Sequence, residues 1–153
     1  MGALENKIPP PIIMAVFLCV MWGVSLIGLT IELSTFTRGI VAISLLVSGV
    51  IFVAGGILTF KKAATTVNPL KPETASTLVT SGIYQITRNP MYLGLTLFLL
   101  AWSAHLCSVL AFCCVPVFVF YINRFQIVPE ERALKEIFGA EFETYKSNVR
   151  RWI

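Results

Sequence analysis

The sequence predicts an all-α integral membrane protein with about four transmembrane helices, the last two forming a hairpin, and with C-terminal helices on the cytosolic face. Of its 153 residues, 56% are hydrophobic and only 13% are charged, whereas about a quarter of the residues in a typical soluble domain are charged. The uncharged residues form long runs that approach the roughly 20 residues needed to cross a bilayer. We therefore expect one membrane domain over residues 1–153.

The first two expected spans cover residues 12–30 and 39–60. The first is an apolar run that follows three consecutive prolines, and the second is an uncharged run that ends at Lys61 and Lys62. The segment before the first span carries little charge, and no small-residue cleavage site is followed by a polar chain. A cleaved signal peptide usually has a positively charged N-terminal region and such a cleavage site, so we expect the first span to be retained.

The third and fourth expected spans, residues 90–104 and 107–124, share one long uncharged stretch. It runs from Asn89 to Asn123 and contains 35 residues, too many for one helix across a hydrocarbon core of about 30 Å at about 1.5 Å per residue. A tight helical hairpin with its turn near His105 fits this length. Such a hairpin returns the chain to the membrane face from which it started.

The distribution of basic residues predicts the orientation of these spans. Four spans place the N-terminus, residues 61–89 and the C-terminal segment on one side, where eleven of the 12 lysines and arginines fall, with only Arg38 opposite. Because basic residues are enriched on the cytosolic side, we expect both termini to face the cytosol. The net charge of +4 needs no nucleic-acid partner, because anionic lipid headgroups are a sufficient one.

The cysteines do not predict a metal site or a disulfide. Cys19, Cys107, Cys113 and Cys114 have no paired ligand spacing, and most lie in apolar helix. We therefore expect them to pack within the membrane domain. Small residues in the second span allow close helix packing, but they leave the oligomeric state open.

Residues 61–89 form a polar segment between the second and third spans. The segment contains Pro69, Pro72 and Gly82, too many helix breakers for one long helix. Irregular backbone near a membrane lines a polar cavity or is covered by protein. Its amides and carbonyls could hold a small polar ligand, and an ordinary interfacial linker is the alternative on composition alone.

A second polar region follows the hairpin, where C-terminal helices are expected over residues 129–150 with a break at Gly139. Glu130 and Glu131 in the first turn could simply complement the helix dipole. They also emerge close to the start of the third span, in a place where a carboxylate needs a cation. That cation could come from a ligand or from one of two arginines, Arg88 and Arg124.

Three motifs follow one another in the second half of the chain. They read Leu78-Val79-Thr80-Ser81-Gly82-Ile83-Tyr84, then Arg88-Asn89-Pro90-Met91-Tyr92-Leu93-Gly94, and then Glu130-Glu131 with Leu134, Phe138-Gly139, Phe142 and Tyr145. This series resembles the pattern of the integral membrane methyltransferases related to isoprenylcysteine carboxyl methyltransferase and the phospholipid methyltransferases. In that family the second and third motifs also enclose a helical hairpin.

The resemblance implies S-adenosyl-L-methionine as methyl donor, S-adenosyl-L-homocysteine as product, and a cytosol-facing pocket above the hairpin. A glutamate in this pocket would bind the positively charged donor, and the donor would supply the countercharge that a partly buried carboxylate needs. The residues that the resemblance assigns to cofactor binding are Ser76, Thr77, Leu78, Val79, Tyr84, Asn89, Pro90, Met91, Tyr92 and Glu130.

Two departures from the family pattern bear on the substrate. Asn89 stands where many members have histidine, and asparagine forms hydrogen bonds but cannot change its charge. The prenylcysteine enzymes place a substrate-orienting arginine four residues before the cofactor-binding glutamate, where this chain has Gln126. Gln126 lacks the bidentate charged grip of arginine, so Arg124 is the candidate replacement. Both are predicted to bind substrate.

The predicted catalytic residues are Glu131 and Arg124. Methyl transfer mainly requires the substrate to be positioned and water to be excluded. A general base could help if the substrate is an amine, and Glu131 is the nearest candidate. His105, the only histidine, is expected at the far end of the hairpin and outside the site.

The sequence therefore predicts methyl transfer from S-adenosyl-L-methionine to a hydrophobic or lipid-like acceptor that enters from the membrane. The alternatives are a phospholipid-headgroup N-methyltransferase and a noncatalytic membrane subunit with the same fold. Membrane lipids and the acceptor are the expected partners. The sequence does not distinguish a carboxylate, an amine and a thiol as the methylated group.

Overall fold

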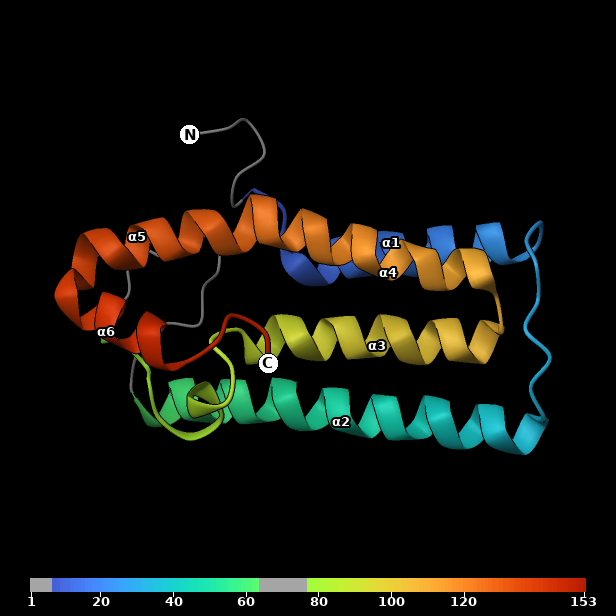
Figure 1. The fold of residues 1–153 in the computed structure, drawn as a ribbon, viewed down its shortest axis with the longest axis horizontal. Helices are drawn as coiled ribbons and strands as arrows, with labels where there is room; N and C mark the ends of the chain where they lie inside the picture. The colour runs from blue at the N-terminus through green and yellow to red at the C-terminus, as the bar shows by residue number, and fades with distance from the viewer. Residues whose placement is uncertain (1–6, 64–76) are drawn as a thin grey trace.

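The chain folds into helices that run roughly parallel to one long axis (Figure 1). The computed structural model describes residues 7–63 and 77–153, and within these ranges the regular elements are helices, with no β-strand. The all-α prediction is thereby confirmed. In chain order the elements are α1 Pro10–Ser25, α2 Thr35–Lys62, the 3-10 turn η2 Gly82–Gln85, α3 Pro90–Leu106, α4 Val109–Ile122, the π-turn η3 Asn123–Ile127, α5 Val128–Phe138 and α6 Ala140–Asn148.

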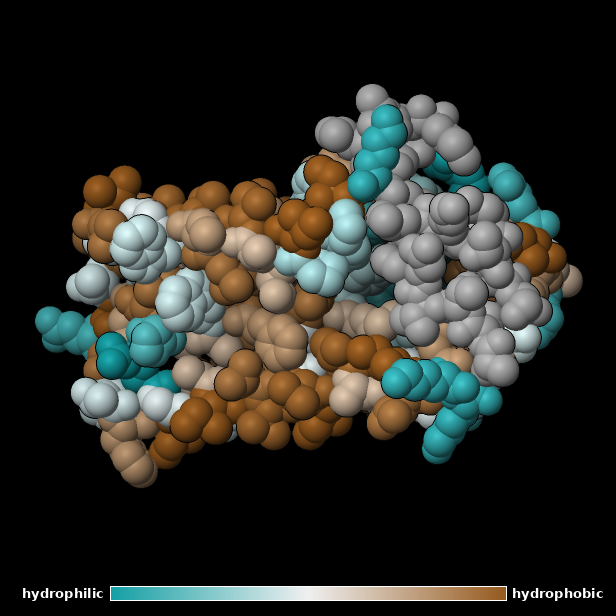
Figure 2. Space-filling model, turned by 180° about the vertical axis from the view of Figure 1, so that it is seen from behind, coloured by the Kyte–Doolittle hydropathy of each residue, from teal (hydrophilic) through white to brown (hydrophobic). Residues whose placement is uncertain are grey.

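Helix α3 lies between α2 on one side and α1 with α4 on the other (Figure 1). Apolar side chains fill the space between α1, α3 and α4, where Met21, Leu99 and Phe118 are fully buried. The outer surface is also apolar: Figure 2 shows hydrophobic side chains over the middle of the helices and hydrophilic ones gathered toward the two ends. Such an exposed apolar surface is stable in lipid and unfavourable in water.

Helices α2 and α3 approach closely because glycines line their contact. A Cβ atom on Gly94 would lie 2.5 Å from Cγ2 of Val53 and 2.8 Å from the carbonyl oxygen of Gly49. A Cβ atom on Gly49 would lie 2.5 Å from the ring of Phe98. The absence of side chains thus lets the two backbones meet, as in many helix pairs within membranes, and it fixes the first turns of α3 against α2.

The connection between α1 and α2 differs from the expected spans. Helix α1 ends at Ser25, before the end of the expected span 12–30, and α2 begins earlier than residue 39. The chain leaves α1 because its backbone pairs with the turn between α3 and α4, and it enters α2 early because a serine caps that helix. The bonds run from the amide of Ile31 to the carbonyl of Cys107 at 2.6 Å, from the amide of Val109 to the carbonyl of Leu29 at 3.1 Å, and from the amide of Thr37 to Oγ of Ser34 at 3.1 Å.

Helices α3 and α4 form the predicted hairpin, and its turn at Cys107 lies near His105 as expected. Cys107 has a φ of 49° in the left-handed region, a conformation that commonly ends a helix. Oγ of Ser108 then accepts a hydrogen bond from the amide of Ala111 at 3.3 Å and caps α4. The expected spans 90–104 and 107–124 therefore correspond to α3 and to α4 with the start of η3.

Two helical stretches are long and apolar enough to cross a membrane, namely Thr35–Lys62 with 28 residues and the continuous stretch Val109–Phe138 with 30. The apolar helices α1 and α3 have 16 and 17 residues, about 24 to 26 Å at 1.5 Å per residue. Among the described residues, helix length and composition therefore support two spans, Thr35–Lys62 and Val109–Phe138. The number of four spans stays a prediction.

Helix α4 continues into α5 without leaving the helical conformation. The link is the π-turn η3, a wider turn that often occurs at functional sites. The sequence predicts a new helix beginning at Pro129, whereas Pro129 is the second residue of α5. The wide turn before it accommodates the missing proline N–H. Gly139, with a φ of 52°, then separates α5 from α6 as expected.

Replacing Gly94 by alanine should destabilise the helix pair by about 1 to 3 kcal/mol, because the added methyl group meets backbone that cannot move aside cheaply. Thermal unfolding in detergent measures this loss. Gly23→Ala is the matched control, since a Cβ atom on Gly23 in α1 meets nothing within 4 Å. Equal unfolding temperatures for the two variants would show that the contact between α2 and α3 is looser than described.

Candidate functional site

Residues 77–89 return the chain from α2 to the start of α3 through a sharp turn. Gly82 has a φ of 59°, which only glycine adopts without strain, and it opens the 3-10 turn η2. The ring of Tyr84 in this turn is buried against Phe60 of α2, with 5.3 Å between ring centres. Oη of Tyr145 in α6 donates to the carbonyl of Tyr84 at 2.7 Å. The turn is therefore held from both α2 and α6.

Tyr92 and Glu130, both predicted cofactor-binding residues, are brought together from α3 and α5. Oη of Tyr92 donates to Oε2 of Glu130 at 3.2 Å. Glu130 lies beyond the uncharged run that ends at Asn123, and burial raises the pKa of its carboxyl group above the usual range. The hydrogen bond from Tyr92 offsets part of this rise, and the neighbouring charge of Glu131 adds to it.

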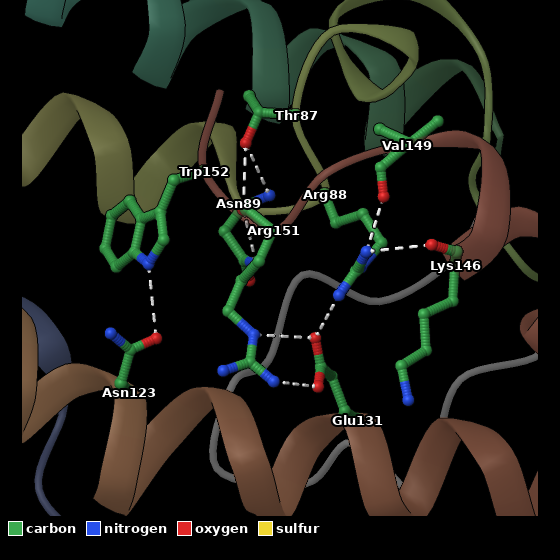
Figure 3. A network of polar contacts seen from close by, with 9 residues as sticks. All are labelled: Thr87, Arg88, Asn89, Asn123, Glu131, Lys146, Val149, Arg151 and Trp152. Carbon is green, nitrogen blue, oxygen red and sulfur yellow. Dashed lines mark hydrogen bonds and ion pairs between the residues drawn. The ribbon is translucent and has the colours of Figure 1, made fainter.

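Glu131, the predicted base, is held by two arginines (Figure 3). Its Oε1 accepts from Nη2 of Arg88 at 2.7 Å and from Nε of Arg151 at 3.1 Å, and its Oε2 accepts from Nη2 of Arg151 at 2.5 Å. Burial alone would raise the pKa of Glu131, but the two guanidinium groups outweigh it and lower the pKa. The pairing of a glutamate with Arg88 is confirmed for Glu131, while the part of Arg151 was not foreseen.

The C-terminal segment, residues 149–152, packs across the start of α3 and reaches η3 (Figure 3). Its carbonyl groups accept hydrogen bonds from residues just before α3, and the indole of Trp152 donates to Asn123. Asn89, predicted to bind cofactor, thus uses its amide nitrogen on this segment. The bonds are the amide of Arg88 to the carbonyl of Arg150 at 3.0 Å, Oγ1 of Thr87 and Nδ2 of Asn89 to the carbonyl of Arg151 at 3.1 and 2.9 Å, Nη1 of Arg88 to the carbonyl of Val149, and Nε1 of Trp152 to Oδ1 of Asn123 at 3.2 Å.

The two predicted substrate residues lie differently on the π-turn. Gln126 is completely buried, and its Nε2 donates to the carbonyl of Ile8 at 2.9 Å. Its Oε1 has no hydrogen-bond partner within the described ranges. Arg124 is exposed, with its guanidinium carbon 5.5 Å from the ring centre of Phe125. Gln126 therefore faces the interior, and Arg124 faces outward.

The other predicted residues divide between the wall of the site and its surroundings. Val79 is buried and Leu78 partly buried, whereas Thr77 is exposed. Pro90 and Met91 form the first turn of α3 against α2, and Ser76 lies outside the described residues. At the other end of α3, His105 stacks on Trp102 at 5.4 Å between ring centres, away from the site as expected. Within the described ranges, the four cysteines are free and no cluster suits a metal ion.

Sequence reasoning missed Thr87, Arg151, Trp152 and Ile8. Thr87 directly precedes a motif residue, and the basic pair at 150–151 with its tryptophan was a visible compositional signal. The carbonyl groups of Ile8 and Arg151 leave no such signal, because every residue has one. These contacts could be found only in the folded chain.

Comparisons with known proteins give a match to one family model and to two similar proteins. A family model described as phospholipid methyltransferase matches residues 37–141. An uncharacterized protein from Haemophilus influenzae is 49% identical over 63 residues, which are 41% of this chain and the whole of that protein. Protein-S-isoprenylcysteine O-methyltransferase B from Arabidopsis thaliana is 28% identical over 107 residues, or 70% of this chain, and the aligned part spans 54% of that protein. No solved structure gives a significant match.

Replacing Glu131 by glutamine should destabilise the protein at neutral pH by about 2 kcal/mol, because two guanidinium groups lose their shared countercharge. The pKa of Glu131 is lowered in the folded protein. Its ion pairs therefore stabilise the fold above the ordinary glutamate pKa and are lost as the pH falls through the lowered value. The gap in thermal unfolding temperature between wild type and E131Q should shrink below about pH 4.

Glu136→Gln is the control for this measurement, because Glu136 is exposed on the same helix and its loss changes the net charge equally. A gap between wild type and E131Q that stays constant from neutral to acid pH would contradict the assigned ion pairs.

Proposed function

We propose that this chain methylates a hydrophobic or lipid-like substrate with S-adenosyl-L-methionine as donor. The chain belongs to the phospholipid methyltransferase family of membrane methyltransferases. One observation carries this proposal. Glu130 is a partly buried carboxylate that receives a hydrogen bond from Tyr92 and, within residues 7–63 and 77–153, has no cationic partner. A carboxylate in such a place is costly until a cation meets it.

The residues around Glu130 fit the proposed cofactor. S-adenosyl-L-methionine carries an ammonium group and, when bound, supplies a methyl group activated by a sulfonium centre. Glu130 offers the countercharge, and residues 77–80, which lie outside the helices, offer backbone amides and carbonyls for hydrogen bonds to the donor. Tyr84 and Asn89 are committed to α2 and to the C-terminal segment by their side chains, so we assign them to the wall of the site. Leu78, Val79, Pro90, Met91 and Tyr92 complete the proposed set.

The contribution of the chain to methyl transfer is positioning and the exclusion of water. The start of α3 is fixed against α2 by the glycine contact and against residues 149–152 by hydrogen bonds. Glu131 is a weak base while two arginines hold it, so we assign it a structural role in place of the predicted catalytic one. Arg124, exposed on the π-turn, stays the proposed residue for orienting a negatively charged part of the substrate.

The membrane orientation is part of the proposal. The start of α3, residues 77–89, α5, α6 and the C-terminus gather at one end of the molecule (Figure 1), and six of the 12 lysines and arginines fall in these segments. We propose that this end faces the cytosol, in keeping with the positive-inside rule. The site then opens at the headgroup level, where a lipid-like substrate can enter between helices.

Gln126 favours an amine over a carboxylate as the methylated group. Its amide orientation is fixed, because Nε2 donates to the carbonyl of Ile8, which can only accept. The atom without a partner in the described ranges is therefore Oε1, a buried acceptor. Gln126 lies one helical turn before Glu130 on the same side of the helix. A substrate that donates an N–H group would satisfy Oε1, whereas a carboxylate would repel it.

Binding of S-adenosyl-L-methionine to detergent-solubilised protein tests the proposed donor. Glu130→Gln should weaken binding about 10- to 100-fold, because a charge-assisted hydrogen bond contributes about 1.5 to 3 kcal/mol. Tyr92→Phe should weaken it less, because only the hydrogen bond to Glu130 is lost. Calorimetry measures both, with Glu136→Gln as control. Absence of saturable binding by wild type, or equal binding by wild type and E130Q, would refute the proposal.

Methyl-labelled cofactor added to membranes that contain the protein tests the substrate class. An amine substrate should give label in the lipid extract that survives mild base, whereas a methyl ester is hydrolysed. Gln126→Leu has nearly the same size and removes the buried oxygen, so it should lower labelling about tenfold or more while cofactor affinity changes little. Base-labile label would overturn the preference for an amine.

A further inference from the structure

The two adjacent glutamates of α5 have different surroundings. Glu131 accepts three hydrogen bonds from the guanidinium groups of Arg88 and Arg151. Glu130 accepts one from the neutral phenol of Tyr92. Successive helical residues point about 100° apart, so the neighbours in sequence face different parts of the molecule. One carboxylate is neutralised within the protein, and the other is left for a partner.

The charge of Glu131 matters to Glu130 because the two carboxylates are close. An uncompensated negative charge beside Glu130 would favour its protonated form and would offer a competing place for a cation. Arg88 and Arg151 place two positive charges on Glu131. This pairing weakens both effects, so the neutralisation of Glu131 favours Glu130 as the cation-binding group.

Arg151 can do this because residues 149–152 form a fixed segment, which we name the C-terminal clamp. The carbonyl of Arg151 accepts from Thr87 and Asn89 just before α3, and the indole of Trp152 donates to Asn123 in η3 (Figure 3). The side chain of Arg151 therefore leaves from a backbone anchored on two sides. The clamp joins the start of α3 to α5, the two elements from which Tyr92 and Glu130 project.

We infer that Arg151 is a positioning residue: through the C-terminal clamp it neutralises Glu131 and thereby reserves Glu130 for the cationic end of the methyl donor. The inference rests on the proposed function, since the donor is its ligand. Arg88 holds the other side of Glu131, but it also carries bonds to the carbonyls of Lys146 and Val149. Arg151 is the partner whose side chain is bonded to Glu131 alone among the described residues.

Three titratable groups of the described residues interact with Glu130. They are Tyr92 from α3, Tyr84 from η2 and Glu131 from α5 itself. Burial raises the pKa of Tyr84, and of Tyr145 behind it, so both phenols stay neutral. Burial therefore raises the pKa of Glu130 most, the hydrogen bond from Tyr92 lowers it, and Glu131 is the neighbouring charge that raises it further.

The experiment measures the affinity for S-adenosyl-L-methionine by calorimetry across pH in wild type and in three variants with changes at these charges. Affinity should rise with pH as Glu130 ionises. Arg151→Gln should move the midpoint of this rise to higher pH and weaken binding at neutral pH about tenfold. Glu131→Gln should move the midpoint to lower pH. The double variant E131Q/R151Q loses one charge of each sign, so its midpoint should return toward wild type.

Arg150→Gln is the matched control, because Arg150 is exposed and only its backbone carbonyl takes part in the clamp. It should keep the wild-type profile although it removes the same charge. The inference is overturned if R151Q and R150Q share one profile, or if the double variant stays with R151Q, as general loss of structure would produce.

A measurement without ligand separates this inference from the proposed function. The carboxyl carbon of Glu130, labelled with ¹³C and assigned by its absence in Glu130→Gln, reports its titration by NMR in detergent. An upward shift of that titration in R151Q but not in R150Q supports the clamp even if wild type binds no S-adenosyl-L-methionine. In that case the proposed function alone fails. An unchanged titration in R151Q refutes the clamp.

Discussion

One end of the molecule carries residues 77–89, α5, α6 and the C-terminus (Figure 1), and we call it the polar end. Its arrangement depends on the carboxylate of Glu131. This carboxylate joins Arg88 before α3 to Arg151 near the C-terminus, residues that are 43 and 20 positions away from it. Closing such long loops costs conformational entropy that grows only slowly with length, and several charge-assisted hydrogen bonds at one place can offset it. Ion pairs therefore hold the polar end together, whereas apolar side-chain packing and close backbone contact hold α1 to α4 together.

These two kinds of contact reinforce each other. The glycines of α2 and α3 fix the first turns of α3 to within van der Waals distance of α2, so Arg88 and Asn89 enter the polar end from a rigid element. A guanidinium group placed in this way loses little further freedom when it binds a carboxylate. Water is also partly excluded there, which strengthens each ion pair and raises the cost of leaving one unmade.

Much of the fold could be predicted from the sequence, because composition and the length of uncharged runs report burial in lipid directly. The hairpin of α3 and α4 and the break at Gly139 follow from such patterns. The early end of α1 could not be predicted, since it depends on backbone pairing between Ile31 and the hairpin turn. The continuity of α4 with α5 was obscured by Pro129, a residue that ordinarily starts or breaks a helix.

The candidate site shows the same division. Motif order placed Tyr92 and Glu130 in one region, and their hydrogen bond agrees with that placement. The motif assigned Glu130 to the cofactor and Glu131 to a possible base, but it could not show that two arginines hold Glu131. Only their neighbours differ, and those neighbours come from α3 and from a segment after α6.

That difference decides which chemistry each glutamate can perform. A carboxylate already paired with two guanidinium groups gains little from a third cation and holds a proton poorly. A carboxylate that meets only a phenol in a partly dry place gains strongly from any cation that reaches it. In the proposed site, the neighbour of Glu130 thus selects which glutamate would bind a positively charged ligand. On this proposal, residues 149–152, which supply Arg151 to Glu131, belong to the site as much as the ligand-facing residues do.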